Sequence, residues 1–263
     1  MAGTPRVRLD RALVERGLAR SRTQAQELIR SGRVRLAGST ALKASDLVGP
    51  DDPLDAQTDP YVSRAAYKLL GALDDLGLRP AGRALDAGAS TGGFTQVLLY
   101  RGCTAVYAVD VGTDQLDPGL RADPRVHVRE QTNLRDLSLE HLDGEPVDLV
   151  VADVSFISLT LLLAPLAAVT RPDRDWLLMV KPQFEVGREA LGRGGVVRDP
   201  TLHLAAVTAV CSAAEGLGRH LAGGTPSRLP GPAGNREFFV HLTTRAPDHP
   251  VELAAVLRPA DAT

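Results

Sequence analysis

The stretch DAGASTGGFT, residues 86–95, decides the fold of this chain. It lies between two apolar runs, and a glycine-rich turn between a strand and a helix lets a ligand approach the backbone closely. The turn opens on Asp86 and lacks the G-x-G-x-x-G spacing of dinucleotide sites. A carboxylate here would repel a pyrophosphate, whereas it suits a cationic group such as an amino-acid ammonium. The turn therefore predicts a site for a positively charged ligand.

Candidate strands and helices alternate around this turn. The candidate strands are Ala84–Ala87, Ala105–Val109, Val126–Arg129, Val147–Ala152, Trp176–Val180 and Phe238–Thr243, and helical patterns lie over Phe94–Tyr100, Leu159–Val169 and Pro200–Glu215. Such alternation predicts an α/β fold, with a mostly parallel, doubly wound sheet and helices on both faces. We expect this Rossmann-like domain to span residues 61–263.

A second carboxylate stands where such a fold binds a ribose. Asp110 ends the second candidate strand, twenty-four residues after Asp86, where it can accept hydrogen bonds from both ribose hydroxyls. The acidic turn, its glycines and this acidic strand end together resemble the S-adenosylmethionine site of class I methyltransferases. The resemblance implies cofactor contacts by Asp86, Gly88, Ser90, Thr91, Gly92, Gly93, Phe94 and Asp110, and Asn133 resembles the residue that contacts adenine. The alternatives are a dinucleotide site or a purely structural turn, and Asn133 could simply shape a turn.

Lysine is scarce in this chain, which holds twenty-seven arginines but only three lysines. Arginine stays charged in proteins, whereas lysine can lose its proton, so a lysine among so many arginines indicates a demand that arginine cannot meet. Lys68 precedes the first strand of the large domain, and Lys181 ends the fifth. The alternative is that these lysines occur by chance and have no special role.

Two carboxylates complete a set with these lysines. Asp153 and Lys181 end neighbouring strands, at the edge where parallel sheets place their ligands, and Glu237 opens the last strand. Lys68, Asp153, Lys181 and Glu237 in this order resemble the tetrad of the FtsJ/RrmJ-type ribosomal RNA 2′-O-ribose methyltransferases. The resemblance implies that Lys181 is the general base, that Lys68 and Asp153 orient it, and that Glu237 contacts Lys68 or the ribose. Separate surface salt bridges are the alternative.

We expect residues 1–60 to form a separate, smaller domain that ends in a linker, and the first 45 of them differ from the rest of the chain in charge. Residues 1–45 carry ten Arg and Lys against three Asp and Glu, a balance of +7, while residues 46–263 have a balance of −9. A basic segment of this kind favours a polyanionic partner. A leucine-bearing helix, a helix capped by Ser21 and a basic hairpin at residues 33–39 resemble the S4-like RNA-binding module. The residues expected to contact RNA are Arg6, Arg8, Arg11, Arg20, Arg22, Arg30, Arg33, Arg35 and Lys43. A solvated, arginine-rich surface is the alternative.

Over residues 5–245 the chain resembles the TlyA family of ribosomal RNA methyltransferases. The resemblance implies S-adenosylmethionine-dependent 2′-O-methylation of cytidine in 16S and 23S RNA, with ribosomal subunits (30S, 50S or both) as partners. DNA is not an expected substrate, because it lacks the 2′-hydroxyl. Tyr61-Val62 departs from the family, where a tryptophan is expected before the valine.

Several classes of protein are disfavoured by composition. Cys103 and Cys211 are the only cysteines, which excludes a disulfide framework and fits the cytoplasm. The six histidines have no metal-ligand spacing, so no metal site is expected. The most apolar stretch, residues 149–169, is interrupted by Asp153 and Pro165, so no membrane partner is expected. A membrane-lytic haemolysin, a non-catalytic ribosome-assembly factor and a small-molecule methyltransferase remain as competing functions.

Overall fold

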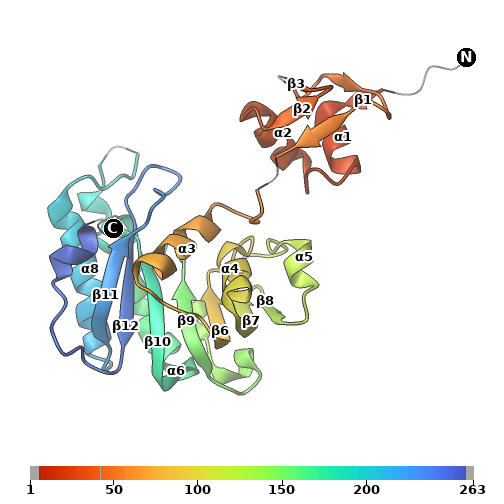
Figure 1. Cartoon of the computed structure of the whole chain (residues 1–263). Coiled ribbons are helices and arrows are strands. Elements are labelled where there is room, and N and C mark those ends of the chain that lie inside the picture. Colours follow the sequence, from red (N-terminus) through yellow and green to blue (C-terminus); the bar gives the residue numbers. More distant parts are fainter. Residues whose placement is uncertain (1–5, 42, 58, 193, 259–263) are drawn as a thin grey trace, which may run out of the picture. The chain divides into compact units, whose positions relative to one another are not determined.

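The structure is a computed structural model that describes residues 6–41, 43–57, 59–192 and 194–258 (Figure 1). The chain divides into two compact units, Met1–Pro60 and Tyr61–Thr263.

The first unit packs two helices against short strands. The helices are α1 (Leu9–Glu15) and α2 (Arg22–Arg30), and the strands are β1 (Val7–Arg8), β2 (Val34–Leu36), β3 (Ser39–Thr40), β4 (Leu47–Val48) and β5 (Leu54–Ala56). β1 pairs with β4, and β2 pairs with both β3 and β5. The buried side chains of Leu9, Leu13, Leu28 and Ile29 form much of its core, because they recur at helical spacing on the inner faces of α1 and α2.

The structure of this unit contains the helix cap and the hairpin that the sequence predicts. Oγ of Ser21 accepts a hydrogen bond from the Gln24 backbone N–H at 3.2 Å, and the Gln24 side chain accepts one from the Arg20 N–H at 2.7 Å. This is the expected cap of α2, with the return bond displaced by one residue. β2 and β3 form the expected hairpin, which turns at Ala37 and Gly38 with φ of 48° and 80°, the positive values that a tight hairpin turn requires.

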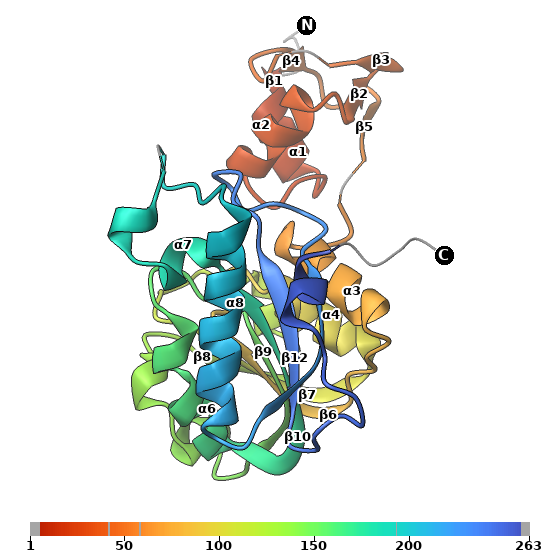
Figure 2. The same cartoon turned by 90° about the vertical axis from the view of Figure 1, so that its left-hand side faces the viewer.

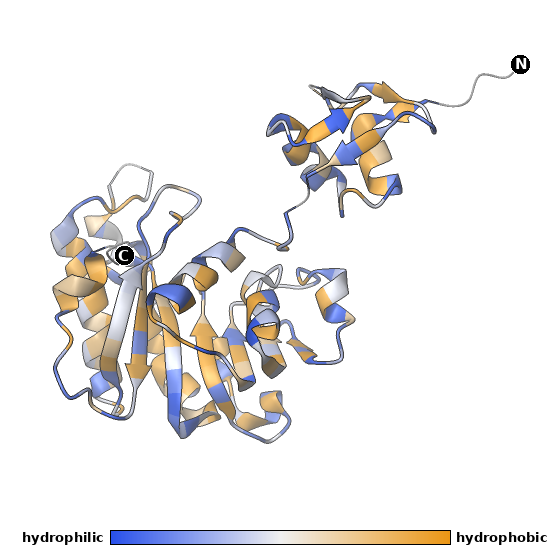
Figure 3. Cartoon of the chain, viewed as in Figure 1, coloured by the Kyte–Doolittle hydropathy of each residue, from blue (hydrophilic) through white to orange (hydrophobic). Residues whose placement is uncertain are grey.

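The second unit contains a seven-stranded sheet in the order β11-β12-β10-β9-β6-β7-β8. The strands are β6 (Gly82–Ala87), β7 (Cys103–Val109), β8 (Val126–Arg129), β9 (Val147–Ala152), β10 (Thr170–Val180), β11 (His220–Pro226) and β12 (Phe238–Thr243). Neighbours from β8 to β10 pair in parallel, whereas β12 is antiparallel to both β10 and β11. The expected mostly parallel sheet is confirmed, and Figure 3 shows that its central strands are largely hydrophobic.

Helices cover both faces of this sheet (Figures 1 and 2). α3 (Ala65–Asp75) and α4 (Gly93–Arg101) pack on one face, and α6 (Leu163–Val169) and α8 (Pro200–Glu215) pack on the other. The remaining helical segments are α5 (Pro118–Arg121), α7 (Pro182–Glu185) and the 3₁₀ turns η1 (Leu134–Asp136), η2 (Leu139–Leu142), η3 (Leu159–Leu161), η4 (Arg188–Ala190) and η5 (Leu253–Leu257). Within the described residues, no helix has both the length and the apolar character needed to span a membrane.

The structure corrects three expected elements. The helix expected over Leu159–Val169 is divided into η3 and α6, with Leu162 between them. The strand expected to begin at Trp176 begins at Thr170, and a register shift accommodates its exposed, polar first half. β11 was not expected from the sequence, because its two glycines and its position at the edge of the sheet leave little apolar alternation.

Candidate active site

A cleft opens at the carboxyl edge of the parallel strands. Ala87 of β6 pairs with Val109 of β7 and Ala152 of β9, so the residues that follow them, Gly88, Asp110 and Asp153, are neighbours at this edge. The cleft has a volume of about 500 Å³. Its lining residues are Gly88, Ser90, Asp110, Val111, Gln115, Thr132, Asn133, Leu134, Arg135, Asp153, Val154, Ser155, Phe156, Ile157 and Leu162.

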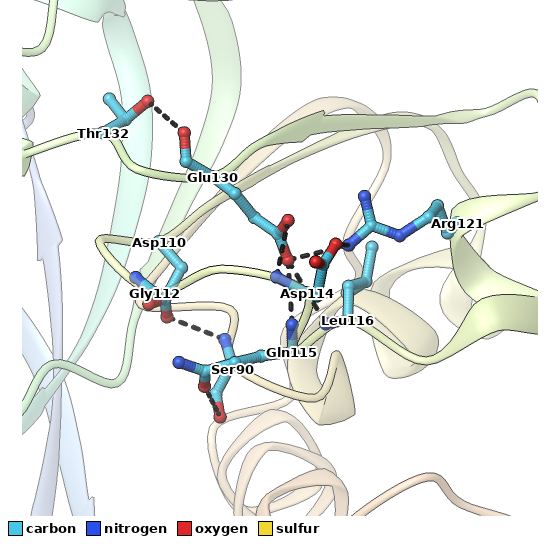
Figure 4. A network of polar contacts seen from close by, with 9 residues as sticks. All are labelled: Ser90, Asp110, Gly112, Asp114, Gln115, Leu116, Arg121, Glu130 and Thr132. Atoms are coloured by element: carbon cyan, nitrogen blue, oxygen red, sulfur yellow. Dashed lines mark hydrogen bonds and ion pairs between the residues drawn. The ribbon is translucent and has the colours of Figure 1, made fainter.

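Asp110 connects the glycine-rich turn to the end of β7. Its Oδ2 accepts a hydrogen bond from the backbone N–H of Ser90 at 2.8 Å, and its Oδ1 accepts one from Gly112 at 2.7 Å (Figure 4). Each carboxylate oxygen has a second lone pair, so both can still accept from a ligand. The carboxylate is therefore held in place at the wall of the cleft.

Glu130, which sequence reasoning missed, supports the wall beside Asp110. Its carboxylate accepts hydrogen bonds from the backbone N–H groups of Asp114 and Gln115, both at 3.0 Å, and forms an ion pair with Arg121 at 2.8 Å (Figure 4). The Arg121 guanidinium and these N–H groups lower the pKa of Glu130 to about 2. Glu130 therefore fixes the loop after β7 from the end of the neighbouring strand.

The glycines of the turn are required by the close approach of the protein's own chain. Gly88 has φ of +87°, and a Cβ there would lie 2.7 Å from the backbone oxygen of Asp153. A Cβ at Gly93 would lie 2.3 Å from Oγ of Ser63, just before α3. These contacts bring the turn against both the end of β9 and the start of α3, so the glycines have a structural role as well as a position beside the cleft.

Asp86 lies beneath the turn, not in the wall of the cleft. Its side chain is fully buried, and its Oδ2 accepts a hydrogen bond from Oγ1 of Thr95 at 2.6 Å, while its Oδ1 has no hydrogen-bond partner among the described residues. Burial, together with the charges of Asp153 and Asp110, raises the pKa of Asp86 to about 7, although the hydrogen bond from Thr95 opposes the shift. Three carboxylates therefore create a negative potential at this edge of the sheet.

Only four of the nine candidate cofactor residues line the cleft. Gly88, Ser90, Asp110 and Asn133 line the cleft. The other five do not line it: Asp86, Gly92, Gly93 and Phe94 are buried, and Thr91 is exposed. The side chain of Asn133 also accepts a hydrogen bond from the Arg135 N–H at 3.1 Å, so it both shapes a turn and faces the cleft.

Lys181 and Asp153 form a largely buried ion pair beside the cleft. Nζ of Lys181 lies 2.6 Å from Oδ1 of Asp153, and the two side chains are 9% and 16% exposed. The same Nζ donates a hydrogen bond to Oγ of Ser155 at 2.8 Å. Sequence reasoning missed Ser155, because no spacing signal connects a loop serine to a lysine on the next strand.

Lys68 and Glu237 form a second pair, in which Nζ lies 2.5 Å from Oε2. Val180 of β10 is paired with Phe238 of β12, so Lys181 and Glu237, each one residue beyond that pair, are neighbours at the same end of the sheet. Of the two contacts expected for Glu237, with Lys68 or with the ribose, the structure contains the one with Lys68, which connects α3 to β12. The four residues thus form two adjoining ion pairs at the carboxyl edge.

The first unit presents its basic side chains to solvent. All nine candidate RNA contacts, Arg6, Arg8, Arg11, Arg20, Arg22, Arg30, Arg33, Arg35 and Lys43, are exposed. The fully buried Asp10 forms ion pairs with Arg8 at 3.1 Å and with Arg22 at 3.0 Å, and these partners hold its pKa well below the usual range. A buried carboxylate therefore positions part of the basic surface.

Comparison with known proteins identifies both units. The FtsJ-like methyltransferase family matches residues 61–244, and the S4 domain matches residues 7–54. The 16S/23S rRNA (cytidine-2′-O)-methyltransferase TlyA of Mycobacterium tuberculosis is 52% identical over 244 residues, which are 91% of this chain and 91% of that protein. The 23S rRNA (cytidine-2′-O)-methyltransferase TlyA of Campylobacter jejuni is 34% identical, over 87% of this chain and 96% of that protein.

A solved structure agrees with this assignment. A protein of Streptococcus thermophilus described as a hemolysin superposes with a TM-score of 0.74 at 35% identity, over 97% of this chain and 95% of that one. The matches cover both units and extend over nearly the whole chain. The chain therefore belongs to the FtsJ-like methyltransferases and, among them, to the family of the TlyA ribosomal RNA methyltransferases.

Proposed function

We propose that this protein transfers the methyl group of S-adenosylmethionine to the 2′-hydroxyl of cytidines in 16S and 23S ribosomal RNA, in the cytoplasm. The observation that carries the proposal is the pair of adjoining ion pairs, Lys181–Asp153 and Lys68–Glu237, beside an acidic cleft. A protein that only bound RNA would have no use for two buried lysines at this edge, because withdrawing ammonium groups from water is costly.

The cleft suits S-adenosylmethionine, which carries a sulfonium and an ammonium. The carboxylates of Asp86, Asp110 and Asp153 favour a cation, and the unpartnered Oδ1 of Asp86 leaves buried negative charge to be compensated. Asp110 would accept the ribose hydroxyls, and Asn133, further along the cleft, would contact the adenine. The volume of about 500 Å³ lies within the usual range for ligand pockets.

Lys181 is the proposed general base. When bound, S-adenosylmethionine supplies an electrophilic methyl group, whose bond to sulfur breaks as its bond to the ribose oxygen forms. The neutral amine of Lys181 accepts the proton that the 2′-hydroxyl loses, and its N–H groups keep the contacts to Asp153 and Ser155. Asp153 then stabilises the ammonium that results.

The first unit is proposed to supply most of the affinity for RNA. Its exposed arginines match a phosphate backbone in charge, and RNA also offers the 2′-hydroxyl that the reaction requires. Phe156, at the edge of the cleft, is 92% exposed, and an aromatic ring in that place can stack on an unpaired base. These features favour RNA over a small-molecule substrate.

Two experiments test the proposal. Ribosomal RNA from cells with and without this protein is mapped for 2′-O-methyl groups, and purified 30S and 50S subunits are incubated with the protein and labelled S-adenosylmethionine. We expect cytidine 2′-O-methyl groups that depend on the protein, and no transfer to DNA of the same sequence. Unchanged methylation together with leakage of liposomes would instead support the haemolysin alternative.

A further inference from the structure

The segment from Asp153 to Leu159 contains several residues of the site, and its backbone is strained at Phe156. Asp153 and Ser155 contact Lys181, and Phe156 is exposed at the edge of the cleft. Phe156 has φ of +66°, a left-handed conformation that a bulky residue adopts only where the surroundings impose it. Something must therefore hold this segment in place.

Glu185 supplies that restraint from the last position of α7. Its Oε2 accepts a hydrogen bond from Oγ of Ser158 at 2.5 Å, and its Oε1 accepts one from the backbone N–H of Leu159 at 2.9 Å. Beside it, the ring of Phe184 packs against that of Phe156, with 5.3 Å between centroids. The segment is thus bound at its start by Lys181 and at its end by Glu185, two residues only four positions apart.

Glu185 does not line the cleft, and its carboxylate is partly buried without a counter-cation among the described residues. Burial raises its pKa above the ordinary value of a glutamate. Partial removal of a carboxylate from water is costly unless hydrogen bonds replace the lost hydration, and the described partners of Glu185 belong to the segment that carries the site. This cost argues for a specific role in holding that segment.

We propose that Glu185 is a positioning residue, which ties the segment Asp153–Leu159 to α7 and so holds the Lys181–Asp153 pair in its reactive geometry. The inference rests on the proposed methyltransferase function. Glu185 does not line the cleft, and it acts through the segment that it binds. A misplacement of about 1 Å at a reacting group can cost about 10²-fold in rate, so the loss of this restraint affects the chemical step.

The test compares E185A, E185Q and D143A with the wild-type full chain. The amide of E185Q keeps an acceptor for the Leu159 N–H and gains a donor for Oγ of Ser158. D143A is the matched control, because Asp143 also accepts two hydrogen bonds, from Tyr107 at 3.0 Å and Arg129 at 2.6 Å, but before the amino end of β9. The readouts are single-turnover methyl transfer at saturating cofactor and subunits, hydrogen exchange at the Leu159 amide, and Tm.

We expect E185A to slow single-turnover transfer by about 10- to 100-fold and to accelerate exchange at Leu159, while E185Q stays within about threefold of wild type. D143A should lower Tm without slowing transfer. The proposal is overturned if E185A reacts at the wild-type rate, if E185Q is as slow as E185A, or if exchange at Leu159 is unchanged in E185A. Should the wild-type protein transfer no methyl group, the proposed function fails, and exchange at Leu159 still decides whether the restraint exists.

Discussion

Nζ of Lys68 lies 2.5 Å from Oε2 of Glu237, although 169 residues separate the two in the chain. The side chains are only 7% and 2% exposed, so neither charge can be compensated by water. Removing one partner of such a pair leaves a buried, uncompensated charge, which is strongly destabilising. Replacing both partners by apolar side chains of similar volume is often neutral or stabilising.

We therefore expect Glu237→Ala to lower the free energy of unfolding by about 3–5 kcal/mol, while the double variant Lys68→Met/Glu237→Met keeps or exceeds wild-type stability. The double variant should still be deficient in methyl transfer. Chemical denaturation and a methyl-transfer assay measure the two effects. Asp123→Ala, which breaks an ion pair at the surface with Arg125, should change stability by less than about 1 kcal/mol. Equal destabilisation of the single and double variants would contradict this account.

Replacing Lys181 by arginine distinguishes a role as general base from a role as a mere positive charge. Arginine keeps the charge but does not lose its proton in proteins, so Lys181→Arg should slow single-turnover methyl transfer by about 10²–10⁴-fold. Affinity for RNA should change little, because the net charge is kept. Lys43→Arg, in the basic unit, is the control and should be nearly silent. A Lys181→Arg protein within about threefold of the wild-type rate would refute the base assignment and leave catalysis to positioning.

We expect Asp86 to make cofactor binding depend on pH. Its pKa of about 7 lies above the ordinary value of 3.8, so the folded protein favours the protonated form of Asp86. The free energy of unfolding that this preference adds is present below about pH 4 and is lost as pH rises from about 4 through 7. A cationic cofactor favours the ionised form, so the affinity for S-adenosylmethionine should increase as pH rises through 7. Calorimetry of Asp86→Asn should show a weaker pH dependence over the same range. The same slope in both proteins would exclude Asp86 as its source.

The basic unit, Met1–Pro60, contains two kinds of arginine: some are free to contact RNA, and others bind the protein's own backbone. Arg30 and Arg33 are exposed and have no ion pair among the described residues, so Arg30→Ala and Arg33→Ala should each reduce the salt dependence of RNA binding by about 0.7–0.9 in log–log slope and leave Tm unchanged.

Arg16 provides the contrast within the same unit. Its guanidinium donates to the backbone oxygens of Asp52 at 2.7 Å and Gly49 at 2.6 Å. Arg16→Ala should therefore lower Tm and leave the salt slope unchanged, as measured by thermal melts and salt titrations. A result in which all three variants reduce the slope equally would show that charge alone decides RNA binding.

Much of the fold could be predicted because its signals are local. The apolar runs that end at Ala87, Val109 and Ala152 identify three central strands, and the residues after them fall at one edge by the rules of parallel sheets. The scarcity of lysine indicated Lys68 and Lys181 as candidate catalytic residues, and the structure contains a contact between Lys68 and Glu237.

The missed residues depend on contacts between distant segments. Ser155, Glu130 and Glu185 have partners on other strands or loops, and no periodicity or spacing reports such contacts. The depth of Asp86 was also not predictable, because a strand pattern specifies the face on which a side chain lies and not how far the turn above covers it.

The late position of β12 in the chain has a consequence for biosynthesis. The basic unit Met1–Pro60 leaves the ribosome and can fold early, whereas Lys68 gains its carboxylate only after Glu237 has been translated. With the proposed activity, a nascent chain acquires affinity for RNA long before it acquires catalytic competence. Translation that stops before β12 would thus release a fragment that occupies the substrate without modifying it, an inhibitor of the finished enzyme.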